Sequence, residues 1–315
     1  MKYFLITLLS LIVLLTILCI VFAGYLFKVA ISRKGAKFGS TELTDMQKKQ
    51  FEMIAGVQEW YDTAEKKKLE ITSYDGLKIC AEFIPAKENP VRSVICAHGF
   101  HASGMKDFGP ILKYYHDNNT NVLIMRQRAH GESEGRYLCY GIKERYDLRD
   151  WLELLNSVLV PEKLPVYLHG VSMGCGTVVM ASDIKLADNV NGVIADCGYT
   201  SPWEEFAHVL KQSFKLPPFP VLYVANVICN FLAGFDMKEV NTLDIMDYER
   251  YPMLFIHGEK DDFVPTWMGK ANYERCVSKK KLVLFKDAAH ALSWTSDIDL
   301  YQNSLKDFME ECETK

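Results

Sequence analysis

The 315-residue sequence has no basic excess, no acidic run, no low-complexity segment and no internal repeat. Its formal net charge is −4, which argues against a nucleic-acid partner, because proteins that bind nucleic acids present basic surfaces. Its nine cysteines follow no spacing typical of a zinc site or a disulfide framework. What remains is a chain with 49% hydrophobic residues, which fits one large α/β domain or two small ones.

Charged residues are also missing from residues 3–27, where Leu, Ile, Val and Phe dominate. A helix of this length spans about 37 Å at about 1.5 Å per residue, enough to cross a bilayer with some tilt. The alternative is a cleaved signal peptide, whose apolar part is usually only about 7–15 residues long. Ala23-Gly24-Tyr25 is a poor cleavage site, so we expect an uncleaved single-pass membrane anchor within residues 1–37.

The sequence leaves open which side of the membrane carries the rest of the chain. Lys28, Arg33, Lys34 and Lys37 come after the apolar segment and only Lys2 precedes it, so the positive-inside rule favours the cytoplasm. Against this, most single N-terminal anchors export the domain attached to them, and long domains can translocate regardless of charge.

Residues 38–68 are polar and helix-prone, and we expect them to form one or two linking helices, with a start signal at residues 41–45 and Lys66-Lys67-Lys68 near the end. From residue 69 to 315 the pattern alternates between strands and helices. A hairpin is expected at residues 69–74 and 77–83 around Asp75-Gly76. Further strands are expected at residues 92–97, 122–125, 165–168, 192–196, 253–256 and 281–285. This alternation predicts a mostly parallel central sheet with helices on both faces.

Residues 202–250 interrupt this alternation. They are rich in aromatic residues and carry Pro217-Pro218-Phe219-Pro220, followed by an apolar stretch from residue 221 to 235. We interpret them as a helical lid inserted between strands, with a buried core helix as the alternative. Residues 221–225 and 227–232 are expected to line an acyl pocket or to bury against the core. Removal of residues 1–37 is expected to give an enzyme that is soluble without detergent.

The sequence Gly170-Val171-Ser172-Met173-Gly174 lies between an expected strand and an expected helix. A serine between two glycines at such a junction is typical of a nucleophile elbow, in which side chains at the glycine positions would collide with the neighbouring strand and helix. A structural turn is the alternative. The context favours Ser172 as a nucleophile.

A serine nucleophile needs a base, an acid that orients the base, and donors for the oxyanion, all at the carboxyl ends of strands. Four of the eight histidines precede a glycine directly after an expected strand and are interpreted as packing or turn residues: His98, His130, His169 and His257. Three others follow no expected strand: His101, His116 and His208. His290 follows the last strand, and the base comes last in chain order in this arrangement. For the acid, the residues alone leave the adjacent Asp261 and Asp262 open.

Taken together, these motifs resemble the α/β-hydrolase superfamily over residues 69–312. Within it the chain is similar to membrane-anchored bacterial hydrolases near the serine aminopeptidase and acylglycerol lipase-like branch. The resemblance implies the α/β-hydrolase fold, and it selects Asp261, the aspartate three residues after His257-Gly258. It also implies that the backbone N–H groups of Phe100 and Met173 form the oxyanion hole.

The chain departs from this family in one turn, where relatives commonly have Asp-x-Arg and this sequence has Arg126-Gln127-Arg128. That aspartate is not part of the triad, so we expect the departure to affect the stability of the loop and not the activity.

The resulting hypothesis is a serine hydrolase that cleaves a carboxylic ester through a Ser172, His290 and Asp261 triad and an acyl-enzyme intermediate, without metal or cofactor. An aminopeptidase of the same fold is an alternative, and it would need a carboxylate near the lid to hold a substrate ammonium. Four candidates stand in or near the lid sequence: Glu204, Glu205, Asp236 and Glu239. A membrane-tethered acyltransferase and a non-catalytic binding protein are further alternatives. The expected partners are a small acyl ester or peptide substrate and the membrane; the sequence does not indicate the oligomeric state.

Overall fold

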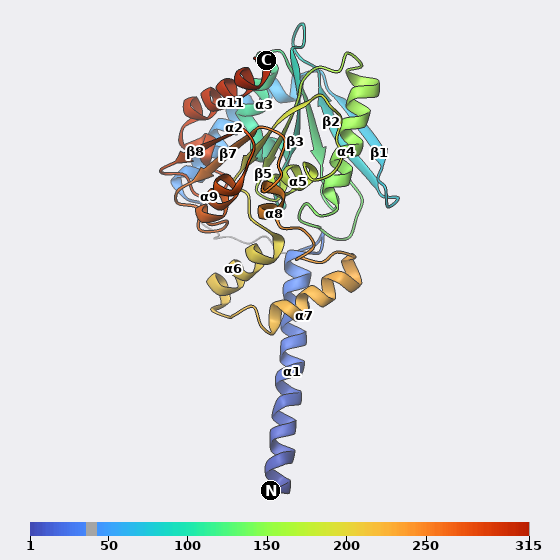
Figure 1. Ribbon diagram of the computed structural model, residues 1–315, viewed down its shortest axis with the longest axis vertical. Helices are drawn as coiled ribbons and strands as arrows, with labels where there is room; N and C mark the ends of the chain where they lie inside the picture. The colour runs from blue at the N-terminus through green and yellow to red at the C-terminus, as the bar shows by residue number, and fades with distance from the viewer. Residues whose placement is uncertain (36–42, 315) are drawn as a thin grey trace.

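A single mixed sheet organises the protein, whose computed structural model describes residues 1–35 and 43–314 (Figure 1). Within the described residues it has eight strands: β1 (Lys67–Thr72), β2 (Lys78–Ile84), β3 (Arg92–Ala97), β4 (Thr120–Arg126), β5 (Val166–Val171), β6 (Val190–Asp196), β7 (Met253–Gly258) and β8 (Lys280–Phe285). Their order is β1-β2-β4-β3-β5-β6-β7-β8. β1 and β2 form the expected antiparallel hairpin, and β3 to β8 run parallel. The expected mostly parallel sheet is confirmed.

Helices cover both faces of this sheet, as expected, because strands buried on both sides need an apolar layer above and below. Two separate clusters of buried apolar side chains mark these layers. One lies under α4 (Glu144–Leu154), α5 (Met173–Ala181), α8 (Thr242–Met246) and α9 (Thr266–Arg275). The other lies under α2 (Asp45–Thr63), α3 (Gly104–Asp117) and α11 (Ile298–Glu313). The described residues also contain three short helical segments: η1 (Leu155–Leu159), η2 (Cys229–Ala233) and α10 (Ser293–Ser296).

The region predicted as a helical linker contributes to the body of the protein. α2 begins with a capping box between Thr44 and Gln47, and it packs Ile54 and Trp60 against the cluster beneath α3 and α11. The expected start signal at 41–45 and the anchor boundary at residue 37 fall wholly or partly in residues 36–42, outside the described residues. Lys67 and Lys68, which we expected near a helix end, lie in β1, because the alternating residues after them pair with β2.

α1 (Lys2–Ala30) extends away from the body, with the N-terminus at its far end (Figure 1). Among the described residues it is the one helix that is long and apolar enough to cross a membrane, by length and composition. Its C-terminal end is held by the body. The Tyr140 hydroxyl donates a hydrogen bond to Ala30 O at 2.7 Å, and the Arg33 guanidinium donates to Ser133 O and Gly131 O.

The insertion between β6 and β7 holds α6 (Pro202–Phe214), α7 (Val221–Ile228), η2 and α8. α6 and α7 lie below the sheet, and α7 packs beside α1 (Figure 1). α8 instead packs against α5 and α9, with Ile245 and Met246 buried. The predicted lid boundary at residue 250 therefore lies too far along the chain. We use the word lid for α6, α7 and η2.

Candidate active site

Ser172 stands at the turn from β5 to α5 with φ 55° and ψ −116°, a backbone conformation that L-residues rarely adopt. A Cβ at Gly170 would lie 2.1 Å from Gly174 O, and a Cβ at Gly174 would lie 1.8 Å from Ala97 O at the end of β3. Both glycines are therefore required by close approach of backbone. This is the collision with neighbouring strand and helix that the sequence predicted.

The structure brings the three predicted triad residues into one hydrogen-bonded chain. The Oγ of Ser172 lies 2.8 Å from Nε2 of His290, and Nδ1 of His290 lies 2.8 Å from Oδ2 of Asp261. The serine follows β5, the aspartate follows β7 and the histidine follows β8, so each side chain comes from the carboxyl end of a parallel strand. This is the hydrogen-bonding geometry of nucleophile, base and orienting acid.

Of the two adjacent aspartates, Asp261 faces the imidazole. It is buried, and its Oδ1 accepts hydrogen bonds from the backbone N–H of Phe263 at 3.1 Å and of Val264 at 2.9 Å. Asp262 is exposed, and its backbone oxygen lies 2.9 Å from Nε2 of His208. The turn after β7 thus fixes one carboxylate and turns the other toward solvent.

Asp261 and His290 each shift the pKa of the other toward its charged form. Burial alone would raise the pKa of Asp261, but the neighbouring His290 and a contact with His257 hold it well below the usual carboxyl range. Burial would likewise lower the pKa of His290, but Asp261, with smaller contributions from Asp107 and Asp196, raises it above the usual imidazole value. Asp261 is therefore ionised, and its negative charge would stabilise an imidazolium at His290.

The predicted oxyanion donors border the same space. Phe100 and Met173 line a pocket together with Ser172, and Met173 opens α5, where N–H groups of the first helical turn lack an intrahelical acceptor. The loop that carries Phe100 is held by Asp107 in α3, whose Oδ2 accepts a hydrogen bond from Gly99 N at 2.6 Å. Asp107 was not predicted, because no sequence pattern links it to that loop.

Asp196 is a second buried carboxylate that was not predicted from the sequence. It ends β6, so the rule that placed the acid after a strand would also have nominated it. Its Oδ2 accepts a hydrogen bond from the Tyr301 hydroxyl at 2.8 Å, and burial raises its pKa to about 6. Because Asp261 holds Nδ1 of His290, Asp196 contributes charge near the base without taking the orienting position.

The histidines interpreted as packing residues are held inside the body. Burial lowers the pKa of His98 to about 4 and the pKa values of His130 and His169 to about 3, so all three are neutral at pH 7. His169, for example, lies between the hydroxyl groups of Tyr115 and Tyr301, at 2.8 and 3.0 Å. They shape the strand ends around the site.

The turn that departs from the family pattern is tied to its surroundings. Gln127 is fully buried; its amide donates to His98 O, and its Oε1 accepts a hydrogen bond from Thr177 Oγ1 of α5 at 2.6 Å. Arg128 is also buried and forms ion pairs with Asp147 and Asp75. The glutamine therefore connects β3, β4 and α5. The residue that departs from the family pattern is Arg126, which forms ion pairs with Glu82 at 2.8 Å and Glu132 at 3.0 Å.

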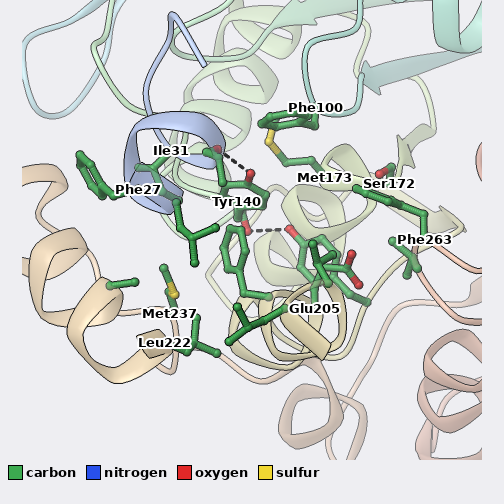
Figure 2. A pocket seen from close by; sticks show the side chains of 18 of the residues that line it. Phe27, Ile31, Phe100, Tyr140, Ser172, Met173, Glu205, Leu222, Met237 and Phe263 are labelled. Atoms are coloured by element: carbon green, nitrogen blue, oxygen red, sulfur yellow. Dashed lines mark hydrogen bonds between the residues drawn. The ribbon is translucent and has the colours of Figure 1, made fainter. Parts of the chain in front are cut away.

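An apolar pocket opens at Ser172 (Figure 2). It is lined from α1, from the body and from the lid by Leu26, Phe27, Ala30, Ile31, Phe100, Tyr140, Ser172, Met173, Tyr199, Glu205, Phe206, Val209, Leu210, Phe214, Leu222, Ala225, Met237, Phe263 and Val264. The two tyrosine hydroxyls are engaged, since Tyr140 donates to Ala30 O and Tyr199 donates to Tyr140 O. Among these lining residues, Ser172 and Glu205 supply the remaining side-chain oxygen atoms.

One group of residues has the composition of a metal site. Ligand atoms of Cys197, Asp261 and His290 lie within 4.8 Å of one another. Burial raises the pKa of Cys197 well above its usual range, so it carries a thiol and not the thiolate that binds metals. Asp261 and His290 are joined to each other, which fits an acid and a base better than two metal ligands.

Comparisons with known proteins agree with this fold. The model of the alpha/beta hydrolase family matches residues 94–300, so the chain belongs to that family and has the α/β-hydrolase fold. Among curated relatives, the Bacillus subtilis protein YqkD is 29% identical over 84% of this chain and 86% of its own length. Protein bem46 of Schizosaccharomyces pombe is 26% identical over 78% of this chain and 77% of its own length.

Solved structures give the same result. The Pyrococcus furiosus esterase Pf2001 superposes with a TM-score of 0.64 at 23% identity, over 79% of this chain and 93% of the esterase. The Pyrococcus horikoshii acylaminoacyl peptidase superposes with a TM-score of 0.58 at 15% identity, over 80% of this chain and 43% of the peptidase. At these identities the likeness shows the fold alone. The family makes the chain a hydrolase, with an esterase and a peptidase among its structural neighbours.

Proposed function

We propose that the chain is a serine hydrolase that cleaves a carboxylic ester with an apolar acyl chain. The observation that supports this most is the hydrogen-bonded chain of Ser172, His290 and Asp261, which ends at an apolar pocket. The Ser172 hydroxyl attacks the ester carbonyl while Nε2 of His290 takes its proton, and the N–H groups of Phe100 and Met173 hold the oxyanion. His290 then gives the proton to the leaving alcohol. Water, activated by the same imidazole, hydrolyses the acyl-enzyme and restores Ser172.

The pocket supports an apolar acyl group over a polar substrate. Each buried methylene gains about 0.8 kcal/mol, which corresponds to roughly a fourfold gain in kcat/KM until the pocket is full. We therefore expect medium-chain esters to be better substrates than acetyl esters.

α1 belongs to this proposal as an uncleaved, single-pass anchor. Leu26, Phe27, Ala30 and Ile31 line the pocket, and a cleaved signal peptide would take no part in the mature active site. Together with the apolar segment before them, they support a division into an anchor at residues 1–37, a connecting segment at 38–68 and a hydrolase domain at 69–315.

An aminopeptidase of the same fold is the second candidate, because one of the four carboxylates considered for binding an ammonium lies in the pocket. That residue is Glu205. Glu204 is exposed, Asp236 accepts hydrogen bonds from the side-chain amide of Asn226 and the backbone of Lys238, and Glu239 lies 3.4 Å from Arg145. These three carboxylates are absent from the pocket lining.

A fluorophosphonate probe and a substrate panel test the proposal. We expect the full-length protein in detergent to be labelled at Ser172, and the matched Ser172→Ala variant to remain unlabelled. We expect p-nitrophenyl esters to be hydrolysed and aminoacyl anilides to be poor substrates. The reverse order of the two substrate classes would favour the aminopeptidase, and an unlabelled but folded wild-type protein would contradict the nucleophile.

A further inference from the structure

Glu205 is a buried carboxyl group without a partner in the pocket that begins at Ser172. Its side chain comes from the first turns of α6 and is 4% exposed. Neither of its carboxyl oxygens has a hydrogen-bond partner among the described residues. Figure 2 shows Glu205 beside the apolar side chains that line this pocket. A buried polar group left unpaired destabilises the fold, so a group in this position indicates a ligand that supplies the missing partner.

The surroundings determine the protonation state of this carboxyl group. Burial raises the pKa of Glu205 well above the usual carboxyl range, and the negative charge of Asp261 raises it further. The group is therefore a neutral acid at pH 7, able to donate one hydrogen bond and to accept others. A substrate hydroxyl matches both capacities. A substrate ammonium would instead require two ions to be buried among apolar side chains, and each ion would lose its hydration.

We propose that Glu205 is a specificity-determining residue that hydrogen-bonds a neutral hydroxyl group of the substrate, so that the ester cleaved at Ser172 carries a hydroxyl as well as an apolar chain. This inference rests on the proposed ester hydrolysis. The hydroxyl can belong to the alcohol portion, as in a monoacylglycerol, or to the acyl chain, as in a hydroxy fatty acid ester.

Four esters test the proposal with the full-length protein in detergent micelles. Propyl dodecanoate is the apolar reference. Glycerol monododecanoate carries hydroxyls on the alcohol portion, and propyl hydroxydodecanoate, hydroxylated at the chain end, carries one on the acyl chain. Dimethylaminopropyl dodecanoate, protonated at neutral pH, carries an ammonium. We expect one of the two hydroxylated esters to exceed the reference in kcat/KM by about ten- to a hundredfold, as the loss of a hydrogen bond to a buried group implies.

Three variants separate recognition from structure. Glu205→Leu, which fills similar space without polar atoms, should abolish the preference, so that the ratio of kcat/KM for the hydroxylated ester to kcat/KM for the reference ester falls to about one. Glu205→Gln keeps a donor and an acceptor and should retain most of the preference. Glu204→Leu changes the exposed neighbour and should behave as wild type.

The possible outcomes are distinct. A wild-type preference for the ammonium ester that Glu205→Gln loses would overturn the proposal in favour of an ionised carboxylate. Equal losses for all esters in Glu205→Leu would show a structural role and overturn it too. Absence of a hydroxyl preference in the wild type would overturn it without any variant, while esterase activity remains. If no ester in the panel is hydrolysed at all, the proposed function fails, and this inference fails with it.

A separate observation concerns the outer face of the lid. Four exposed apolar side chains recur at intervals of four residues along α7 and η2 and the residues just before them: Phe219, Tyr223, Val227 and Phe231, at 70, 47, 68 and 87% exposure. We call them the lid stripe. The opposite side of this segment is buried, including Leu222, which reaches the pocket. The segment that we expected to line the pocket or bury against the core thus also turns a second apolar face outward.

The position of α1 indicates the environment of this stripe. α7 packs beside α1, and the part of α1 that extends beyond this contact is apolar and exposed (Figure 1). Near the stripe, Nζ of Lys238 lies 3.7 Å from the ring centre of Trp203 and 4.4 Å from that of Tyr223. Aromatic rings combined with a lysine are typical of the layer where a bilayer meets water.

We infer that the lid stripe lies in the interfacial layer of the bilayer that α1 spans, and that the pocket behind it takes its substrate from the membrane. Amphipathic helices commonly lie in this layer with their apolar face buried about 5–10 Å into the boundary between headgroups and acyl chains. The lid would then be covered by lipid, and the pocket would receive an ester without passing it through water.

The test compares two substrates for full-length protein in phosphatidylcholine vesicles: glycerol monododecanoate dissolved in the bilayer and p-nitrophenyl butyrate in water. The double variant Val227→Glu, Phe231→Glu should lower kcat/KM for the bilayer substrate at least tenfold and leave the water-soluble substrate within about twofold, since neither residue lines the pocket. Val158→Glu is the matched control, because Val158 is 65% exposed but precedes the amino end of β5, whereas Ser172 follows the carboxyl end of that strand.

Equal effects on the two substrates, or no effect on either, would overturn the inference. A change in oligomeric state of the double variant in detergent would also overturn it, because a second copy of the chain would then be the partner that covers the stripe.

Discussion

Removal of residues 1–37 should destabilise the hydrolase domain, whereas removal of residues 1–21 should not. Within α1 and just after it, Phe27, Val29 and Ile31 are 8, 6 and 1% exposed. Burial of one such side chain contributes about 1.5–3 kcal/mol, so loss of the three together costs roughly 4.5–9 kcal/mol. The entire unfolding free energy of a domain is about 5–15 kcal/mol. The longer truncation therefore removes much of the stability, together with one wall of the pocket.

Urea unfolding and substrate profiles of the two truncated proteins measure this difference. We expect the protein that lacks residues 1–21 to keep the urea midpoint and acyl-chain preference of the full-length protein. The protein that lacks residues 1–37 should unfold at much lower urea or fail to fold, so the sequence-based expectation of a detergent-free enzyme after this truncation is revised. Phe27→Ala in the full chain is the matched point variant, with an expected loss of about 3–5 kcal/mol. Identical midpoints and chain-length profiles for the two truncations would refute the packing of α1 as a structural element of the site.

Four further predictions concern the site. Ser172→Ala and His290→Ala should each lower kcat on the order of a million-fold without unfolding the protein, and near-normal turnover in either would contradict the mechanism. Asp261→Asn should lose about 10⁴ in rate while Asp262→Asn stays within roughly tenfold, and the reverse ranking would move the acid by one residue. Burial lowers the pKa of His290, but Asp261 outweighs this effect and raises the pKa above the ordinary value of about 6.5. Because the base must be neutral to take a proton, kcat/KM should fall as the pH decreases through an inflection above that value. An inflection below about 6.5 in the pH profile would contradict the raised pKa. Asp107→Ala should loosen the loop after β3 and therefore lower kcat more than it raises KM. Asp107→Asn should recover most of the rate, because an amide oxygen can accept the same hydrogen bond from Gly99 N. Equal losses in both variants would count against this positioning role.

The sheet could be predicted well because parallel strands buried on both faces leave a strong signal. Each appears as a short apolar run, and β3, β5, β6 and β7 are buried throughout or nearly so. The candidate site was predicted from the same apolar runs, because side chains that follow the carboxyl ends of parallel strands lie at one end of the sheet and can contact one another. Chain order then favoured His290 as the base, but it left Asp261 and Asp262 both open as the acid, and the family resemblance selected Asp261.

Other features could not be predicted because they depend on where separate elements meet. Glu204 and Glu205 are equivalent in the sequence, yet one faces solvent and the other the pocket, a difference of one position on α6. Asp107 reaches the oxyanion loop only because α3 packs over β3 and β4. The sequence predicted that residues 221–225 and 227–232 line a pocket or bury against the core, but not that Tyr223, Val227 and Phe231 face outward, because the partner on each side of a helix is a tertiary property.

In the proposed arrangement, α1 would anchor the chain and would also set the height of the proposed active site above the membrane. Residues 3–22 of α1 would span about 30 Å, which is the thickness of the hydrocarbon core of a bilayer. Leu26 and Ile31, which line the pocket, come next at about 6 and 13 Å beyond that core along the helix axis. The headgroup layer is roughly 5–8 Å thick on each side, so Leu26, at the near edge of the pocket, would lie within this layer. An ester held at this level would place its carbonyl at Ser172 while its chain remains among apolar side chains, and a pocket wall that belongs to the proposed anchor would keep that height fixed.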